Sequence, residues 1–471
     1  MAGRNTLPGV GEEQGHDRSG RARPWRRVLR AGRLRDGSRR GPRRARRARC
    51  VWPRIRRARV HLAGLRRAAR AARRPGGELN PSLLVVVQRY GDVPGGAEAH
   101  ARSVVQRLAP HFAIEVATTN STDYLSWRGD LTAGLDRVDG VTVRRFPVER
   151  PRAWNFKLYE RRAFRSRHTL EDERAFIDAQ GPYAPELLDF LFKRGRDYDH
   201  VLFFTYIYYP TVLGLPLVPE RAVLVPTAHE ESAIGLAAYK PVFHAPRAIA
   251  YNTEEERRMV WRRFRNERVS NEIVGVGIDV PAERNATRFR EKHGITGPYL
   301  LYVGRIGVSK GSRELFANYE RWRASDPAHD VSLVLIGDAE TRVPKTSGIV
   351  HLGRLGEQDK WDALAGCAAF VMPSLLESLS LVTLEAWAAG RPVIVDAHSP
   401  VLAGMARRAG AGLAYHGPAE FAEICELLID DPALADRLGR SGADFVARTY
   451  TWPRVVDSYL DLFAEVRARL H

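Results

Sequence analysis

The sequence predicts an α/β protein with two doubly wound parallel-sheet domains that face an interdomain cleft. Strand-length apolar runs without polar alternation recur along the chain, which is typical of strands covered on both faces. Helix-period segments separate many of these runs, so parallel sheets are expected. The motif GVGID at residues 275–279 turns the chain from one unit into the next. A cleft between two such units is the usual place for a substrate.

The first unit is expected to span residues 78–275. Its first strand is predicted at residues 83–87, and a loop then leads to a helix at residues 97–108. Residues 150–180 are charged and irregular, and we interpret them as an inserted excursion. Further strands are predicted at residues 114–118, 141–146, 201–204, 222–225 and 248–251, with helices at residues 185–194 and 254–264.

The second unit is expected to span residues 276–450, after a short strand at 272–274. The chain from residue 420 onward has no strand pattern and predicts only helices. The expected strands are 299–303, 331–336, 349–352, 369–372 and 393–395, and the expected helices are 311–323, 357–365, 379–389, 420–429, 432–449 and 452–470.

The positive charge of the chain is concentrated at its beginning. Residues 1–77 contain 25 Arg, no Lys and four acids, which gives them a net charge of +21. The whole chain carries +19, so residues 78–471 carry −2. This head has no hydrophobic periodicity and is expected to be disordered. A basic arm for nucleic acid or anionic lipid is one interpretation. We favour a second, that the true start lies near residue 78, because the composition is that of a stretch not selected for folding.

The cysteines and the apolar runs indicate the cellular compartment of the protein. Cys50, Cys367 and Cys425 form no CxxC pair, which argues against a zinc site or a disulfide framework and suits a reducing cytoplasm. The longest uncharged run, residues 201–219, is broken by Pro210, Gly214 and Pro216. We therefore expect a buried strand and the start of a helix there, not a membrane span.

Residues 373–395, PSLLESLSLVTLEAWAAGRPVIV, form the most informative stretch. Glu377 lies in the loop before a helix and Glu385 lies more than a turn inside it. The amides of Ser378, Leu379 and Ser380 are expected at the helix start, where free N–H groups accept oxygen-rich ligands. A carboxylate beside free amides suits the hydroxyls of a sugar or a ribose, although two solvated glutamates would look the same.

Two other loops place charge or open backbone near the expected cleft. Arg305 ends one strand and Lys310 precedes the next helix, where both suit a diphosphate. Gly95 and Gly96 stand at the start of the first helix, and glycine allows backbone to approach a ligand closely. His229 follows the strand at 222–225, which places it at the carboxyl edge of the sheet. Each residue taken alone is as readily structural.

Together these residues resemble a GT-B-fold glycosyltransferase of the retaining family 4 type. The resemblance covers residues 80–471. It depends on the order and spacing of GG at the first helix, His229, GVGID, VGR followed by KG, and Glu377 with Glu385 eight residues later.

The resemblance implies a role for each matching residue. Glu385 would hold the ribose of a UDP- or GDP-sugar, and Glu377 with the amides of residues 378–380 would hold the donor sugar. Arg305 and Lys310 would carry the diphosphate without a metal or another cofactor. His229 would contact the sugar near the reacting carbon, and Gly95 and Gly96 would let the loop close over the donor. Residues 451–471 would form a helix that packs back on the first domain.

Several points stay open at the sequence level. Ser378 and Ser380 replace the usual glycines of the family, and Leu379 replaces the aromatic between them, so the donor sugar is uncertain. The acceptor is an unknown glycan, lipid or small molecule, approached by Tyr206, Tyr208 and Tyr209 if these side chains face the cleft. A sugar-nucleotide epimerase or a phosphorylase of the same fold, and nucleic-acid binding through the head, are the alternatives. We expect the protein to be cytoplasmic, and peripheral contact with the inner face of the membrane is left open. Nucleic acid is not expected as a partner.

Overall fold

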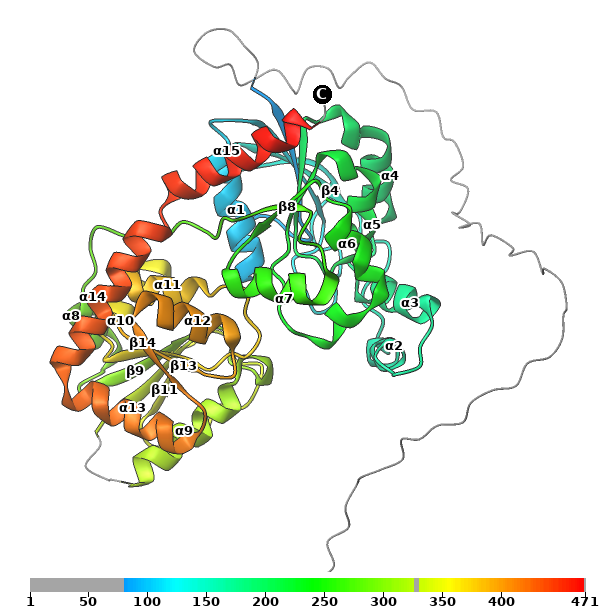
Figure 1. Ribbon diagram of the computed structural model, residues 1–471. Coiled ribbons are helices and arrows are strands. Elements are labelled where there is room, and N and C mark those ends of the chain that lie inside the picture. Colours follow the sequence, from blue (N-terminus) through cyan, green and yellow to red (C-terminus); the bar gives the residue numbers. More distant parts are fainter. Residues whose placement is uncertain (1–79, 326–329, 470–471) are drawn as a thin grey trace, which may run out of the picture. The chain divides into compact units, whose positions relative to one another are not determined.

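The computed structural model describes residues 80–325 and 330–469, and it confirms the α/β class with two parallel sheets (Figure 1). The first sheet runs in the order β3-β4-β2-β1-β5-β6-β7-β8, and only the β3–β4 pair is antiparallel among the described strands. Its strands are β1 (Ser82–Val86), β2 (Ala113–Thr119), β3 (Gly134–Val138), β4 (Val141–Phe146), β5 (His200–Phe204), β6 (Ala222–Val225), β7 (Ala248–Tyr251) and β8 (Ser270–Ile273).

Apolar side chains on both faces make the central strands of this sheet part of the core. Residues of β1 and β5 are almost completely buried, as continuous apolar runs require. The helices that connect the strands are α1 (Gly96–Leu108), α2 (Phe156–Ala163), α3 (Leu170–Gln180), α4 (Pro185–Arg194), α5 (Tyr209–Gly214), α6 (Lys240–His244) and α7 (Glu254–Phe264).

The second sheet has the order β11-β10-β9-β12-β13-β14, and all of its described pairs are parallel. Its strands are β9 (Tyr299–Val303), β10 (Ser332–Ile336), β11 (Ile349–His351), β12 (Ala369–Met372), β13 (Val393–Asp396) and β14 (Gly412–Tyr415). Its helices are α8 (Ala286–His293), α9 (Ser312–Ser325), α10 (Glu357–Gly366), α11 (Leu381–Ala388), α12 (Pro400–Ala409), α13 (Pro418–Asp430) and α14 (Pro432–Thr449).

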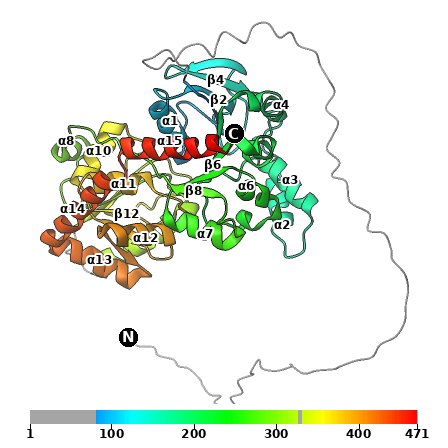
Figure 2. The same cartoon turned by 45° about the horizontal axis from the view of Figure 1, so that its top comes forward.

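The last helix, α15 (Trp452–Ala468), returns to the first sheet (Figure 2). It contacts α1, β5, β7 and β8, and the Phe463 ring packs against Phe112 with ring centroids 5.2 Å apart. At its start, the Trp452 indole donates a hydrogen bond to Asp279 at 3.0 Å. A Cβ on Gly277 would lie 2.4 Å from the Trp452 ring, so the GVGID turn needs glycine there. The crossing helix expected for the fold is therefore confirmed.

The sequence analysis missed several elements. Residues 150–180 are not irregular: they contain α2 and α3, and Thr169 and Asp172 form a capping box at the start of α3. The charged composition hid these helices, because α2 buries only Ala163 fully. The edge strand β3 was also missed, since its exposed sequence GLDRV has no buried face. Strand β14 and helices α8 and α12 were also missed, although α12 buries Val401, Leu402 and Met405 at helical spacing.

The head at residues 1–77, with the expectations attached to it, lies outside the described residues. The domain boundaries at residues 275 and 450 remain a prediction. The strands of the first sheet precede residue 275, and those of the second sheet follow it.

Candidate active site

A cleft of about 1,020 Å³ is lined by residues from both sheets. Its walls come from the carboxyl ends of β1, β5, β6, β7, β9, β10 and β12 and from the starts of α1, α10 and α11. Carboxyl ends of parallel strands meet at one edge of a sheet, so loops distant in the sequence converge there. Of the residues predicted for the site, the cleft is lined by Gly95, Gly96, His229, Arg305, Lys310, Glu377, Ser378, Leu379 and Ser380.

Lys310 and Glu377 form an ion pair within this cleft. The Lys310 ammonium donates to Glu377 Oε1 at 2.6 Å, and 28% and 14% of the two side chains are exposed. Gly311 makes this approach feasible: its φ is +70°, and a Cβ there would lie 2.4 Å from the Pro373 carbonyl oxygen. The turn before α9 and the loop after β12 are thus in direct contact, which brings a cation and a carboxylate to one point.

Arg305 is engaged by partners that the sequence analysis did not identify. Its guanidinium donates to Glu340 Oε1 at 3.0 Å and to the Tyr124 hydroxyl. Tyr124 also donates to Glu340 at 2.7 Å, and the Arg305 guanidinium lies 4.7 Å from the centre of the Tyr124 ring. Although partial burial opposes it, these hydrogen bonds hold the pKa of Glu340 below its usual value. Arg305 therefore belongs to a charged cluster to which both domains contribute.

Glu385 does not line the cleft, contrary to a direct reading of its predicted role. It pairs with Lys360 of α10, whose ammonium donates to Glu385 Oε1 at 2.8 Å, and Lys360 does line the cleft. Burial raises the pKa of Glu385, against the opposing effect of Lys360. Its second oxygen, Oε2, is buried and has no hydrogen-bond partner among the described residues. The acceptor atom is thus available to a ligand that reaches past Lys360.

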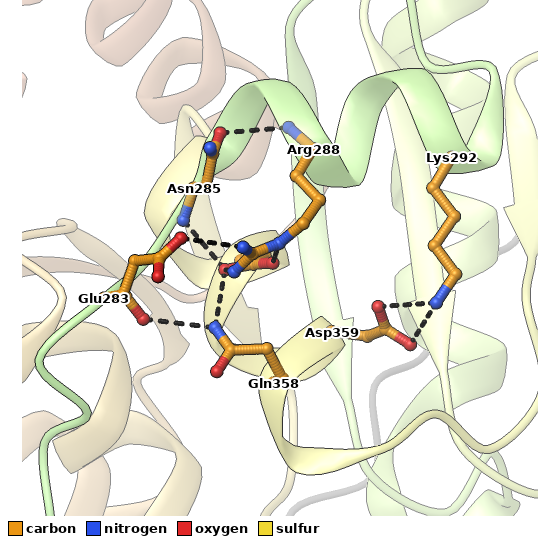
Figure 3. Close-up of polar contacts among 7 residues, drawn as sticks. Glu283, Asn285, Arg288, Lys292, Gln358 and Asp359 are labelled. Atoms are coloured by element: carbon orange, nitrogen blue, oxygen red, sulfur yellow. Dashed lines mark hydrogen bonds and ion pairs between the residues drawn. The ribbon is translucent and has the colours of Figure 1, made fainter.

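Helix α10 is held in position by α8 (Figure 3). Arg288 donates two hydrogen bonds to the fully buried Asp362 carboxylate, at 2.6 and 2.9 Å. Lys292 donates to both oxygens of Asp359 at 2.9 Å. Because Asp359 and Asp362 flank Lys360 on the same helix, this network orients the lysine that meets Glu385.

On the opposite wall, a buried ion pair shapes the start of α1. Glu98 Oε1 accepts from Gln88 and twice from Arg89, at 2.7–3.0 Å, and both charged side chains are buried. Gly95 has a φ of +149°, and a Cβ there would overlap Glu98 Oε2 at 2.0 Å. Glycine is therefore required at Gly95. A Cβ on Gly96 would meet nothing within 4 Å, so that position is open toward the cleft.

His229 lies in a loop that is fixed by a buried carboxyl group. Glu256 of α7 accepts hydrogen bonds from the amides of Ala228 at 2.5 Å and Asn252 at 2.6 Å. His229 Nδ1 stands 3.5 Å from Glu231 Oε1. The loop after β6, which carries the histidine, is consequently tied to the end of β7.

The end of β7 in turn contacts the loop that carries Glu377. The side-chain amide of Asn252 donates to Ser378 Oγ at 3.3 Å, and the Thr253 hydroxyl donates to the Ser378 carbonyl at 3.0 Å. Ser378 thus participates through its own side chain and backbone. The helix begins later than expected, because α11 starts at Leu381 with Ser380 as its N-cap.

The tyrosines expected on the acceptor side are divided by the structure. Tyr206 and Tyr208 line the cleft, but Tyr209 does not. Tyr209 is buried at the start of α5 and packs against Tyr183, with ring centroids 4.9 Å apart. The cleft residues missed from sequence include Tyr124, Glu340 and Lys360. The sequence did contain a signal for Lys360, which is a basic residue one turn into the helix predicted at 357–365. It contained no such signal for Tyr124 or Glu340.

One protein-family model matches part of the second domain. Residues 297–431 match the family described as Glycosyl transferases group 1. This glycosyltransferase group 1 region contains Arg305, Lys310, Glu377 and Glu385.

Two curated relatives of the chain are named as a glycosyltransferase and a synthase. The chain is 28% identical over 257 residues to D-inositol 3-phosphate glycosyltransferase from Streptomyces avermitilis, covering 50% of this chain and 55% of the relative. It is 28% identical over 193 residues to alpha-maltose-1-phosphate synthase from Mycobacterium tuberculosis, covering 36% and 49%. The chain spans about half the length of these curated relatives.

Solved structures show the same fold. Sucrose-phosphate synthase from Thermosynechococcus elongatus superposes with a TM-score of 0.60 at 15% identity, covering 83% of this chain and all of that one. The Anabaena protein HepE, solved in complex with UDP and glucose, superposes with a TM-score of 0.58 at 13% identity, covering 82% and 100%. The fold is therefore that of the GT-B glycosyltransferases.

Within residues 80–325 and 330–469, no group of three or more His, Cys, Asp or Glu side chains is placed to hold a metal ion. In the same residues, every helix is too short or too polar to span a bilayer.

The buried Glu256 carboxyl predicts a pH dependence of stability. Burial raises its pKa to about 8, against an ordinary value of 4.5. Between these values the folded protein holds a proton that the unfolded chain releases, so the stabilisation from this group is complete below about pH 4.5 and is lost as the pH rises through about 8. The free energy of unfolding of the wild type, minus that of Glu256→Gln, should fall over this range in urea denaturation. A difference that stays flat, or that the exposed Glu272→Gln reproduces, would contradict this.

Proposed function

We propose that the protein is a retaining glycosyltransferase of the family 4 type that moves a sugar from a nucleotide-diphosphate donor to a hydroxyl acceptor. One observation carries the proposal: the glycosyltransferase group 1 region contains the two lysine–carboxylate pairs, Lys310–Glu377 and Lys360–Glu385, at the cleft wall. The fold supports it, because GT-B proteins such as HepE have been solved with UDP in place.

The donor is assigned to the second-domain side of the cleft. Glu385 Oε2, which lacks a partner among the described residues, would accept from a ribose hydroxyl. Glu377 and the amides of residues 378–380 would bind the donor sugar. Gly96 would let the loop before α1 approach the donor. A UDP- or GDP-sugar fits these groups equally, so we retain both.

Arg305 and Lys310 would stabilise the leaving diphosphate. When the bond between the anomeric carbon and the diphosphate oxygen breaks, its electron pair leaves with the nucleotide, and negative charge accumulates there. In the described structure each cation is paired with a carboxylate, Arg305 with Glu340 and Lys310 with Glu377. We infer that the diphosphate competes with these carboxylates for the cations. His229 would contact the sugar near the reacting carbon, on the face that the acceptor approaches.

The alternatives are less well supported. A sugar-nucleotide epimerase would share the fold, but the curated relatives are named as a glycosyltransferase and a synthase. Nucleic-acid binding would depend on residues 1–77, which lie outside the described structure. We therefore propose that the protein is cytoplasmic and that it transfers the sugar without a cofactor.

A contact with the cytoplasmic face of a membrane is supported by residues 150–168. This segment has seven Lys and Arg residues and one acid, although residues 78–471 as a whole carry −2. Trp154 is 96% exposed and Leu158 is 48% exposed, and they stand beside the exposed cations Lys157 and Arg161. Tryptophan and arginine side by side suit the interface of an anionic bilayer. We propose that α2 and the residues before it rest on such a surface.

Donor binding tests the assignment of the two glutamates. Loss of a hydrogen bond to a charged group typically costs about 1.5–3 kcal/mol, so Glu385→Ala should weaken UDP or GDP binding by roughly tenfold or more. Glu377→Ala should reduce discrimination between the sugar nucleotide and the bare nucleotide. Titration calorimetry measures both, with Glu423→Ala on the exposed face of α13 as a control. Two variants that retain wild-type affinity and discrimination would remove the assignment.

Transfer should proceed without a divalent metal and should depend on Arg305 and Lys310. Removing one such preorganised partner typically costs about 3–4 kcal/mol, or roughly 10²–10³ in rate. Lys310→Ala and Arg305→Ala should therefore reduce turnover far more than they change the melting temperature. The assay is sugar transfer with EDTA present. Activity abolished by EDTA, or retained in both variants, would refute this mechanism.

Binding to vesicles tests the membrane contact. Each basic side chain at an anionic surface contributes about 1 kcal/mol, so the double variant Arg161→Ser, Arg165→Ser should bind phosphatidylglycerol-containing vesicles roughly tenfold or more weakly. Trp154→Ser should also weaken binding. Phe192→Ser, which removes an exposed ring from α4, is the control. All variants keep residues 1–77, so the difference reports on residues 150–168 alone. Equal sedimentation of wild type and variants with vesicles would exclude the contact.

A further inference from the structure

A second cavity, of about 360 Å³, adjoins the cleft and lies within the first domain and the loop before Glu377. Helices α2 and α3 form one wall through Glu160, Phe164 and Phe176, and the loop after His229 forms another. Gln180, Ile207, Glu231 and Leu376 line both the cavity and the cleft, so the two are continuous. Its volume lies in the range of about 300–1,000 Å³ that is typical of small-molecule sites.

The lining of this cavity combines carboxylates with phenyl rings. Glu160, Glu230 and Glu231 contribute the carboxylates, and the Phe164 and Phe176 rings have centroids 5.2 Å apart. Carboxylates accept hydrogen bonds from hydroxyl groups, and an aromatic face packs against the C–H face of a sugar ring. The same lining repels an anion, because none of the described residues that line the cavity is Lys or Arg.

The described cations near the cavity do not line it, although Arg152 donates to the Gln180 carbonyl at 3.2 Å. Glu160 and Glu230 have partners in Lys157 and Arg262, but the side chains of those partners are 81% and 68% exposed and do not line the cavity. Arg89, a cation on the first-domain wall of the cleft, is held by four hydrogen bonds. It donates to Glu98, the Thr122 carbonyl and the Pro94 carbonyl.

An independent observation indicates that a polar ligand belongs in the cleft with which this cavity is continuous. Thr205 is 7% exposed and lines the cleft at the end of β5, and its Oγ1 has no hydrogen-bond partner among the described residues. Its φ is +67°, a left-handed conformation uncommon for a β-branched residue. Asn252 lines the same cleft, and its buried Oδ1 likewise has no hydrogen-bond partner among the described residues. Buried polar atoms of this kind usually have partners, so a bound hydroxyl group would complete them.

We propose that this cavity binds the acceptor, and that the acceptor ring is a neutral, hydroxyl-rich ring without phosphate. The inference rests on the proposed glycosyltransferase function and specifies its substrate class. Glu231 stands beside His229, and Leu376 precedes Glu377, so a ring in the cavity reaches the proposed reacting centre. The acceptor hydroxyl oxygen bonds to the anomeric carbon, the bond to the diphosphate oxygen breaks, and the hydroxyl proton leaves with the nucleoside diphosphate.

The test compares matched acceptors that differ only in a phosphate. The full chain, with the nucleotide sugar that it binds in calorimetry, is assayed against glucose and glucose 6-phosphate, mannose and mannose 6-phosphate, and myo-inositol and its 3-phosphate. We expect kcat/KM to be at least about tenfold higher for the neutral member of the preferred pair. Preference for the phosphorylated member, equal use of both, or transfer to neither in any pair would overturn the proposal.

Substitutions in the cavity locate the effect. Glu160→Gln and Phe164→Ser should raise the acceptor KM about tenfold, with donor affinity unchanged, whereas the exposed Glu171→Gln on α3 should change neither. Glu160→Lys should shift preference toward the phosphorylated member of the pair. An unchanged acceptor KM in both cavity variants would overturn the assignment of the cavity. Failure to bind any nucleotide sugar would instead refute the proposed function itself, and calorimetry on the wild type distinguishes the two outcomes.

Discussion

The ion pair between Lys310 and Glu377 is the interaction on which the geometry of the cleft depends. It joins the turn before α9 to the loop after β12, two segments that are 67 residues apart in sequence. Gly311 permits the contact, because any side chain there would collide with the Pro373 carbonyl. The loop that this pair positions also reaches the first domain, where Asn252 and Thr253 contact Ser378. One ion pair thereby aligns groups that belong to both sheets.

Charge is distributed unequally over the two walls of the cleft. On the second-domain wall, Arg305, Lys310 and Lys360 are each held by carboxylates, so the free site already contains partners that an anionic donor would displace. Such pairing holds the three cations in position before a ligand arrives. The first-domain wall instead has Glu160, Glu230 and Glu231 in its side cavity. An anionic donor and a neutral acceptor fit this division, because each then meets the wall that attracts it.

Most of the fold could be predicted from apolar runs. The runs at β1, β5, β6, β9, β12 and β13 are continuous because both faces of these strands are buried, and they were found within a residue or two. The elements that were missed lie at edges or carry charge. Strand β3 is exposed along its length, and α2 turns Arg161 and Arg162 to solvent while Phe164 faces a cavity. Hydrophobic periodicity cannot report such elements, since little of their surface is buried.

The sequence alone determined the α/β class and the two parallel sheets, because local apolar patterns encode them. The resemblance to GT-B glycosyltransferases added the returning last helix and, together with the motifs, nine residues that line the cleft. Only the tertiary structure decided the partners of those residues. Arg305 meets Tyr124 and Glu340, Glu385 lies behind Lys360, and Glu256 fixes the loop that carries His229. These contacts join residues 25 to 181 positions apart, and Tyr209, next to two cleft tyrosines, turns into the core. Side-chain pairing of this kind depends on how loops converge at the sheet edges, and that convergence has no local signal in the chain.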